Sequence, residues 1–183
     1  MFIVMVTPEC APVAVAGGLG EVIFGLSREL ELRGHAVDII LPKYNCMRYD
    51  QIYQLTVAYH DLWVPWYSGL VHCTVWFGLV HGRWCYFIEP HSQDNFFNRG
   101  HLYGSVDDVT RFAFFAKAAM EFMLKTNRRP EVIHCHDWQT ALCPPSSTRF
   151  ISTWACRINA SATPSTISVI KASLESTFCG PPG

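Results

Sequence analysis

The sequence predicts an α/β fold with a mostly parallel sheet, and three stretches of the chain lead to this prediction. A short apolar run at residues 2–6 is followed by a glycine-rich loop, a segment with helical apolar periodicity, and a second apolar strand from His35. A strand, a loop, a helix and a further strand in this order indicate a right-handed parallel crossover. A third apolar run at residues 132–135 predicts another buried strand. The expected sheet is Rossmann-like.

The first crossover helix is expected to begin near Leu19, where apolar residues start to recur at helical spacing. Gly34 follows the last of them and is a natural residue to end a helix. The next strand covers residues 35–41. Residues 55–89 are rich in β-branched and aromatic side chains and predict an inserted hairpin or meander.

A second, long helix is expected over residues 106–126, which contain a stripe of apolar residues at helical spacing. Ser105 and Asp108 resemble a capping box at its start. The buried strand at residues 132–135 follows the helix, and its carboxyl end leads into residues 136–138. Open α/β sheets bind their ligands at that edge.

Composition limits the classes of partner. The chain has 183 residues, half of them apolar, and a formal charge of -1, which argues for one domain and against an extended nucleic-acid surface. No apolar run approaches the roughly 18 residues that a membrane helix needs. Eight cysteines at irregular spacing, in a chain that opens on a strand-like run without a secretory signal, predict reduced thiols and a cytoplasmic location. A neutral small molecule or a polysaccharide is the expected partner.

The cluster Gly17-Gly18-Leu19-Gly20 stands between the first strand and the first helix. Glycines at such a place let backbone N–H groups approach a phosphate, and the helix end favours an anion. Ile23 occupies the place of the third glycine of the dinucleotide fingerprint, so NAD binding is disfavoured. A tight turn that needs a positive φ is the purely structural alternative.

Two further features have competing interpretations. His134 and His136 lie two apart on a strand and would share a face, but no second ligand cluster accompanies them, so we expect no metal and interpret His134 as a core histidine. The polar and aromatic loop at residues 91–104 suits sugar recognition. Within it, Arg99 and Tyr103 either contact a ligand or pin the loop.

Four segments together resemble the N-terminal domain of bacterial glycogen synthases and plant starch synthases. They are PECAPVAVAGGLGEV, GHAVDIILPKY, FIEPHSQDNFFNRGHLYG and RPEVIHCHDWQT. The resemblance implies that residues 1–142 form the N-terminal half of a retaining glucosyltransferase of the GT-B fold. Such enzymes transfer glucose from ADP-glucose to the non-reducing end of an α-1,4-glucan, without a metal or another cofactor.

The resemblance also implies roles for the residues of the glycine loop. Gly17 and Gly18 would line the donor phosphates and glucose, and Glu21, where the family usually has Asp, would lie near the nucleotide. Val15 stands where the family pattern Lys-x-Gly-Gly-Leu has its lysine. A hydrogen bond to a charged group contributes about 1.5–3 kcal/mol, so the loss of this lysine predicts weaker donor binding.

The sugar-facing residues are implied in the same way. Asn98 and Tyr103 would face the glucose and the acceptor. His136 and Asp137 would be catalytic residues, and Trp138 would form part of the cleft wall and bind sugar.

Residues 143–183 differ from the rest, since they are rich in Ser and Thr and lack a clear amphipathic period. The family motif Thr-Ile-His-Asn-Phe is absent from the protein, but the codons for residues 163–168 can spell it in a shifted frame. We therefore expect a frameshift near Leu142, an out-of-frame and disordered tail, and an inactive fragment.

Two alternatives to a glycogen or starch synthase domain remain at this point. One is a non-catalytic glucan-binding module, because the acceptor-facing loop is present. The other is a different GT-B enzyme, such as a sucrose or trehalose-phosphate synthase, against which the PECAP and LPKY segments argue.

Overall fold

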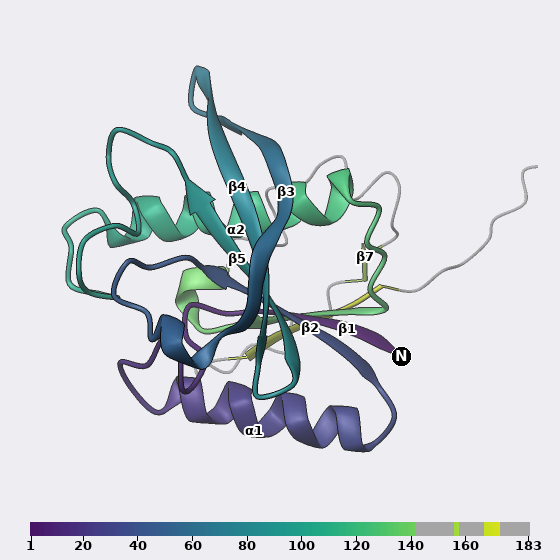
Figure 1. Ribbon diagram of the computed structural model, residues 1–183. Coiled ribbons are helices and arrows are strands. Elements are labelled where there is room, and N and C mark those ends of the chain that lie inside the picture. The colour runs from purple at the N-terminus through teal and green to yellow at the C-terminus, as the bar shows by residue number, and fades with distance from the viewer. Residues whose placement is uncertain (142–155, 158–166, 173–183) are drawn as a thin grey trace, which may run out of the picture.

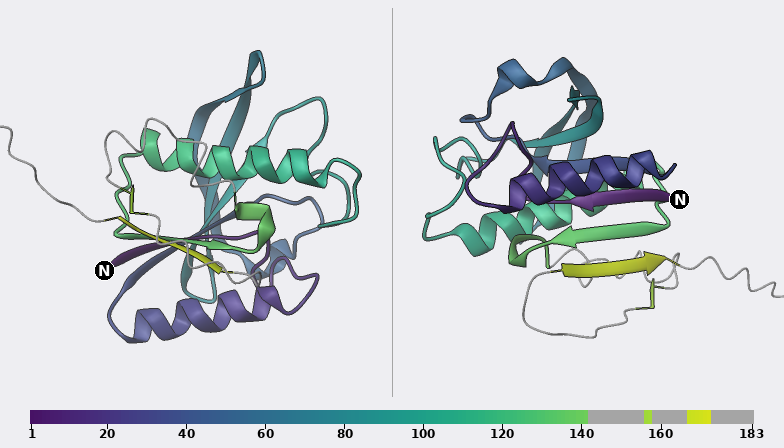
Figure 2. Two further views of the ribbon diagram at one scale, coloured as in Figure 1. Left: turned by 180° about the vertical axis from the view of Figure 1, so that it is seen from behind. Right: turned by 90° about the horizontal axis from the view of Figure 1, so that it is seen from below.

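The computed structural model describes residues 1–141 and the backbone of residues 156–157 and 167–172. Its strands form one sheet in the order β3-β4-β5-β2-β1-β6-β8-β7 (Figure 1). Helices α1 and α2 lie on opposite faces of this sheet (Figure 2). The arrangement is that of a Rossmann-like α/β domain, as predicted.

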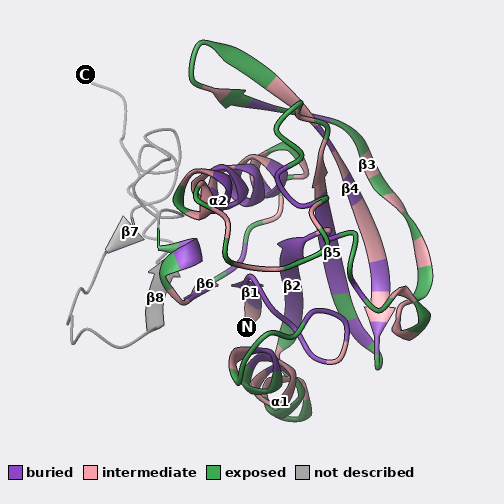
Figure 3. Cartoon of the chain, turned by 90° about the vertical axis from the view of Figure 1, so that its left-hand side faces the viewer, coloured by how far each residue is buried: buried purple, intermediate pink, exposed green. Residues whose placement is uncertain are grey.

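The parallel part of the sheet is built around β1 (Phe2–Val6). This strand pairs in parallel with β2 (Ala36–Pro42) on one side and with β6 (Val132–His136) on the other. All but the first residue of β1 are buried, because elements cover the sheet on both faces (Figure 3). The continuous apolar runs of the sequence therefore correspond to the centre of the sheet.

Helix α1 (Leu19–Leu32) provides the first crossover, between β1 and β2. Arg33 is its C-terminal cap, and Gly34 follows with a φ of 81°, the left-handed conformation that glycine adopts without steric cost. Predicted start and stop are both confirmed.

The predicted meander is formed by β3 (Tyr53–Trp66), β4 (Gly69–Val80) and β5 (Arg83–Pro90). Both internal pairings are antiparallel, and β5 also pairs in parallel with β2. The insertion therefore continues the main sheet instead of standing apart from it, and it places the carboxyl end of β5 beside that of β2.

Helix α2 spans Asp108–Lys125 and buries a face made mostly of Phe, Ala and Met. Half of the predicted capping box forms, because the Asp108 carboxylate accepts hydrogen bonds from the backbone N–H groups of Ser105 and Gly104. The Ser105 hydroxyl contacts His101 instead of the helix backbone, and Asp107 is the residue at the cap position.

Beyond residue 141 the structure describes β7 (Cys156–Arg157) and β8 (Ile167–Ala172), which pair with each other, and β8 pairs antiparallel with β6. The rest of the expected tail, residues 143–183, lies outside the described residues, so its frameshifted origin stays a prediction. None of the helices in the described part of the chain has the length and apolar character needed to cross a membrane.

Candidate functional site at the carboxyl edge of the sheet

The predicted site segments all follow carboxyl ends of parallel strands. The glycine loop, residues 15–20, leads from β1 into the first turn of α1. The loop at residues 91–104 follows β5, and residues 136–138 form the end of β6 and the turn after it. Because β5, β2, β1 and β6 are consecutive parallel neighbours, these ends meet at one edge of the sheet. This edge is where open α/β sheets bind ligands.

Glu9 organises the glycine loop. Its side chain is buried, with 4% of the residue exposed. Oε2 accepts hydrogen bonds from the backbone N–H groups of Ala16, at 2.8 Å, and Gly17, at 3.0 Å. Glu9 was not among the residues predicted from the sequence. The available indication was a single carboxylate three residues after an apolar strand, among apolar neighbours, because a buried acid needs a partner.

The glycines of this loop leave space at its surface and allow close backbone packing, and they do not form a left-handed turn. Gly18 has a φ of -72°, and neither Gly17 nor Gly20 is among the glycines with positive φ, so the turn alternative is wrong. A Cβ atom on Gly17 or Gly18 would meet nothing within 4 Å, which leaves open space at the surface of the loop. A Cβ atom on Gly20 would lie 3.2 Å from the Ala11 nitrogen and from Val15 Cγ2.

The start of α1 has unused hydrogen-bond donors. The N–H groups of Gly18, Leu19, Gly20 and Glu21 donate to no acceptor among the described residues, and no side chain caps the helix. Free amides at the positive end of a helix are a suitable site for a phosphate. Val15 and Glu21 are both exposed beside these amides in the sequence, and within the described chain no ion pair involves residues 15–21.

Tyr103 connects the sugar-facing loop to the glycine loop, because its hydroxyl donates a hydrogen bond to Glu9 Oε1 at 2.7 Å. Burial, followed by this hydrogen bond, raises the pKa of Tyr103, so the phenol stays protonated. The Tyr103 ring contacts Phe112 with a centroid distance of 5.7 Å, and Phe112 contacts Trp138 at 5.9 Å. Predicted residues from three segments are thus brought together.

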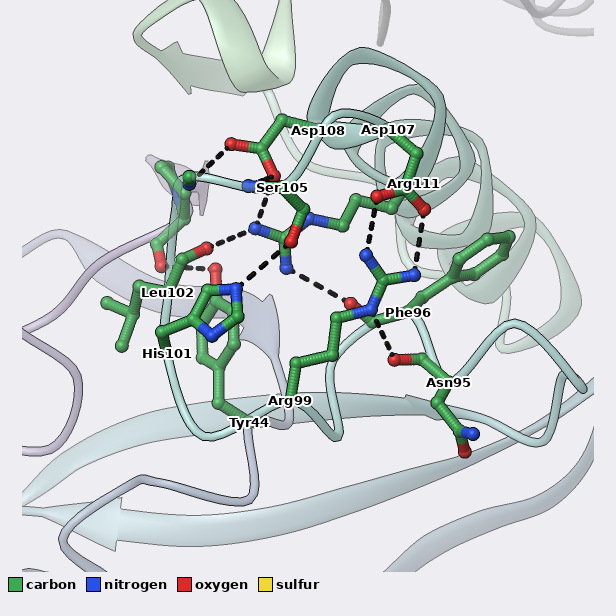
Figure 4. A network of polar contacts seen from close by, with 12 residues as sticks. Tyr44, Asn95, Phe96, Arg99, His101, Leu102, Ser105, Asp107, Asp108 and Arg111 are labelled. Atoms are coloured by element: carbon green, nitrogen blue, oxygen red, sulfur yellow. Dashed lines mark hydrogen bonds and ion pairs between the residues drawn. The ribbon is translucent and has the colours of Figure 1, made fainter.

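Arg99 pins its loop (Figure 4). Its guanidinium donates to both carboxylate oxygens of Asp107 and to the carbonyls of Asn95 and Asp94. All three guanidinium nitrogens are engaged within the loop and the start of α2. Of the two interpretations of Arg99, the structure supports the one in which it holds the loop.

Arg111 is a second anchor of this loop and was not predicted from the sequence. It has no exposed surface, and it donates to Asp108 and to the carbonyls of Phe96 and Leu102 (Figure 4). An arginine next to Phe112 in the apolar stripe of a helix was the available indication, since a cation on a buried face needs partners.

Asn98 is exposed and lines a cavity of about 220 Å³ together with Lys43, Glu89 and His91. Lys43 Nζ lies 2.9 Å from Glu89 Oε1, and the Trp76 indole N–H donates to Glu89 Oε2. Burial raises the pKa of Glu89, but the hydrogen bonds from Lys43 and Trp76 outweigh it and the pKa is lowered. The cavity is therefore lined by charged and amide groups, which suit hydroxyl-rich ligands.

His134 and His136 lie side by side at the end of β6, with ring centroids 4.0 Å apart. Burial lowers the pKa of both, and His134 contributes to a value of about 3 for His136. Both rings are therefore neutral at physiological pH. Their Nε2 atoms are buried and have no hydrogen-bond partner among the described residues. His134 is half-buried whereas His136 is buried, with 2% of the residue exposed, so the interpretation of His134 as a core histidine stays a prediction.

Asp137 has a backbone conformation that aspartate rarely adopts, with φ 64° and ψ 175°. Its carboxylate accepts a hydrogen bond from the Trp138 N–H at 2.7 Å. Strained residues of this kind persist where the surroundings hold them, and they cluster at functional sites. The catalytic roles of His136 and Asp137 stay predictions. Across residues 1–141, no group of three or more His, Cys, Asp or Glu side chains is placed to hold a metal ion.

The chain is similar to curated glycogen synthases. Glycogen synthase 1 of Synechococcus sp. is 67% identical over 144 residues, which cover 79% of this chain and 29% of the relative. Glycogen synthase 2 of Methylococcus capsulatus is 68% identical over 139 residues, covering 76% and 28%. The chain therefore spans less than a third of these relatives.

A solved structure and a family model give the same result. The catalytic domain of starch synthase IV from Arabidopsis thaliana, bound to ADP and acarbose, superposes with a TM-score of 0.76 at 44% identity, over 78% of this chain and 29% of that one. The model of the starch synthase catalytic domain matches residues 2–167. The chain therefore belongs to the starch synthase catalytic domain family.

Proposed function

We propose that this chain is the donor- and acceptor-facing part of a retaining glucosyltransferase that moves glucose from ADP-glucose to the non-reducing end of an α-1,4-glucan. One observation supports this most directly. In a chain of this family, free amides at the start of α1 lie at the same sheet edge as Tyr103 and Trp138. One set of groups suits a diphosphate, and the other suits a sugar.

The geometry supports a division of roles. The amides of Gly18 to Gly20 would bind the donor phosphates beside Gly17, Val15 and Glu21. Tyr103, Asn98 and Trp138 would contact the glucose and the acceptor, and His136 and Asp137 would lie at the reacting sugar. Preorganised donors aimed at developing charge usually contribute most to catalysis, and this arrangement needs no metal. We expect a cytoplasmic location.

A chimaera tests the proposed activity. Residues 1–141 of this chain would replace the matching part of Glycogen synthase 1 of Synechococcus sp., and transfer of labelled glucose to glycogen would be measured. We expect transfer from ADP-glucose in preference to UDP-glucose. A folded chimaera that transfers no glucose, while the parent relative is active in the same assay, would contradict the proposal.

The chimaera and the 183-residue chain together distinguish the proposed enzyme from a non-catalytic glucan-binding module. That alternative predicts that the 183-residue chain co-sediments with glycogen while the chimaera remains inactive. Our proposal predicts an active chimaera, whether or not the chain by itself retains glucan.

We also propose that residues 143–183 are encoded out of frame and that the chain by itself is inactive. The alignment with Glycogen synthase 1 covers 144 of the 183 residues, and the codons of residues 163–168 can spell a motif of the family in a shifted frame. The coding DNA tests this directly. A nucleotide sequence whose shifted frame does not read Thr-Ile-His-Asn-Phe ends this proposal.

A further inference from the structure

The Glu9 carboxylate joins two loops that are far apart in the sequence. Oε2 holds the N–H groups of Ala16 and Gly17, and Oε1 holds the hydroxyl of Tyr103 at 2.7 Å. The first two residues belong to the glycine loop, and the third belongs to the loop after β5. One buried side chain therefore sets the position of each loop relative to the other.

The backbone around Glu9 is itself fixed. The Thr7 hydroxyl donates to the Glu9 carbonyl at 2.8 Å, and the Glu9 N–H donates back to this hydroxyl at 3.3 Å. The hydroxyl of Tyr44, which is fully buried, donates to the Pro8 carbonyl at 3.0 Å. Cys10 and Ala14 exchange two backbone hydrogen bonds at 2.9 Å. The carboxylate is thus held on a rigid support, as a group that positions others must be.

The hydrogen bonds of Glu9 also decide which amides remain for a ligand. Glu9 engages the N–H groups of Ala16 and Gly17, whereas those of Gly18, Leu19 and Gly20 have no acceptor among the described residues. A ligand phosphate would therefore bind one residue further along the loop than Gly17. Glu9 accepts three hydrogen bonds in all, so its buried charge is satisfied without a cation.

We propose that Glu9 is a positioning residue of the donor site, an inference that rests on the proposed function. It holds the glycine loop in the conformation that leaves the amides of Gly18 to Gly20 free for the diphosphate of a sugar nucleotide. Through Tyr103 it keeps the sugar-facing loop beside them. Glu9 itself touches no substrate, because its carboxylate is occupied by the protein.

Glutamine separates position from charge at this site. In Glu9→Gln the side-chain carbonyl oxygen can still accept from both loop amides, and the new amide group can donate to the Tyr103 oxygen. The hydrogen-bond geometry is kept and the charge is lost. In Glu9→Ala all three bonds are lost, and in Tyr103→Phe only the link between the loops is lost.

The experiment uses the 183-residue chain and two readouts: amide hydrogen exchange of the two loops, and the Kd for ADP and ADP-glucose measured by calorimetry. For Glu9→Ala we expect exchange of the Ala16 and Gly17 amides to accelerate, and the Kd for ADP to rise, each by about tenfold or more. Glu9→Gln should change both readouts clearly less than Glu9→Ala, because it keeps the three hydrogen bonds in their weaker, neutral form. Tyr103→Phe should accelerate exchange in residues 99–105 and leave residues 15–18 unchanged.

Glu29→Ala is the matched control, because Glu29 is an exposed acid of α1 that, among the described residues, forms an ion pair with Arg33 alone and contacts neither loop. It should change neither readout. Thermal unfolding of each variant shows which of them fold, and Tyr103→Phe and Glu9→Gln keep the test open if Glu9→Ala does not.

Three results would overturn the inference, and they differ from failure of the proposed function. Unchanged exchange in a folded Glu9→Ala protein would show that Glu9 does not hold the loop. Equal loss of ADP binding in Glu9→Gln and Glu9→Ala would show that charge, not position, matters. Unchanged loop exchange in Tyr103→Phe would remove the link between loops. If wild type shows the expected loop protection but binds neither ADP nor ADP-glucose, the proposed function fails together with the donor part of this inference.

Discussion

Arg111 and Asp108 form an ion pair at the start of α2, with the Arg111 Nε donating to Asp108 Oδ1 at 2.8 Å. The arginine is completely buried. The same Asp108 carboxylate also accepts hydrogen bonds from the backbone N–H groups of Gly104 and Ser105, just before the helix. This pair, together with Arg99 and Asp107, therefore anchors the loop that carries Tyr103 to the start of α2.

Arg111→Ala should destabilise the domain strongly. Removing one partner of a buried ion pair typically costs about 3–5 kcal/mol, because the remaining charge and the carbonyls of Phe96 and Leu102 are left unpaired. Denaturant unfolding followed by circular dichroism would measure the loss. Arg28→Ala, at an exposed position of α1, is the control and should have little effect. A loss below about 1 kcal/mol for Arg111→Ala would contradict this account.

Asp137→Gly should give a more stable protein than Asp137→Ala. Both variants lack the carboxylate, but only glycine adopts φ 64° and ψ 175° without steric cost, and strain of this kind amounts to about 1–3 kcal/mol. The difference in unfolding free energy between the two variants therefore measures the cost of the backbone conformation at residue 137. Both variants should abolish glucose transfer by the chimaera. Equal stabilities would mean that Asp137 is not strained in solution.

Asp38→Asn should stabilise the domain at neutral pH. Burial raises the pKa of Asp38 to about 6, against which the nearby Arg128 acts only in part. Because the folded pKa lies above the unfolded value of 3.8, the stability that Asp38 contributes is present below pH 3.8 and lost as the pH rises through 6.

The neutral Asn variant lacks this pH-dependent loss. Relative to wild type, Asp38→Asn should therefore gain about 1–3 kcal/mol of unfolding free energy between pH 3.8 and pH 8. Paired denaturant titrations at the two pH values measure the gain. Asp50→Asn, at an exposed position paired with Arg48, serves as the comparison and should show no such gain. The prediction would be refuted if the difference in unfolding free energy between wild type and Asp38→Asn were the same at both pH values.

Val15→Lys should strengthen donor binding. Val15 is 45% exposed next to the free amides of α1, so a lysine can reach a bound diphosphate without being buried. A hydrogen bond to a charged group contributes about 1.5–3 kcal/mol, which corresponds to about a tenfold or greater fall in the Kd for ADP. The gain should shrink at high salt. Val109→Lys adds the same charge at an exposed position of α2 and should leave the Kd unchanged.

Local patterns were enough to predict the fold. Burial on both faces explains the apolar runs of the strands β1, β2 and β6. Burial on one face explains the apolar periodicity of the helices α1 and α2. The pairing of β5 with β2 is a contact between distant segments, and nothing in the order of residues 83–90 indicates it.

The site was predictable in its segments but not in its contacts. The two interpretations of Arg99 could be separated only by its bonds to Asp107, and the turn interpretation of the glycines only by the φ of Gly18. Glu9 was overlooked because its partner Tyr103 is 94 residues away in the sequence. Long-range polar contacts of this kind have no periodicity to reveal them.

Gly20 has a consequence for protein engineering. Its hydrogen-only side chain lets the first turn of α1 pack against Ala11, at a separation that a methyl group would have to force apart. If this loop is grafted onto another scaffold, Gly20 therefore has to be kept, although it is buried. Gly17 and Gly18 leave steric room for alanine. Tolerance to substitution in this segment is therefore lowest at Gly20, where the helix meets Ala11 and Val15.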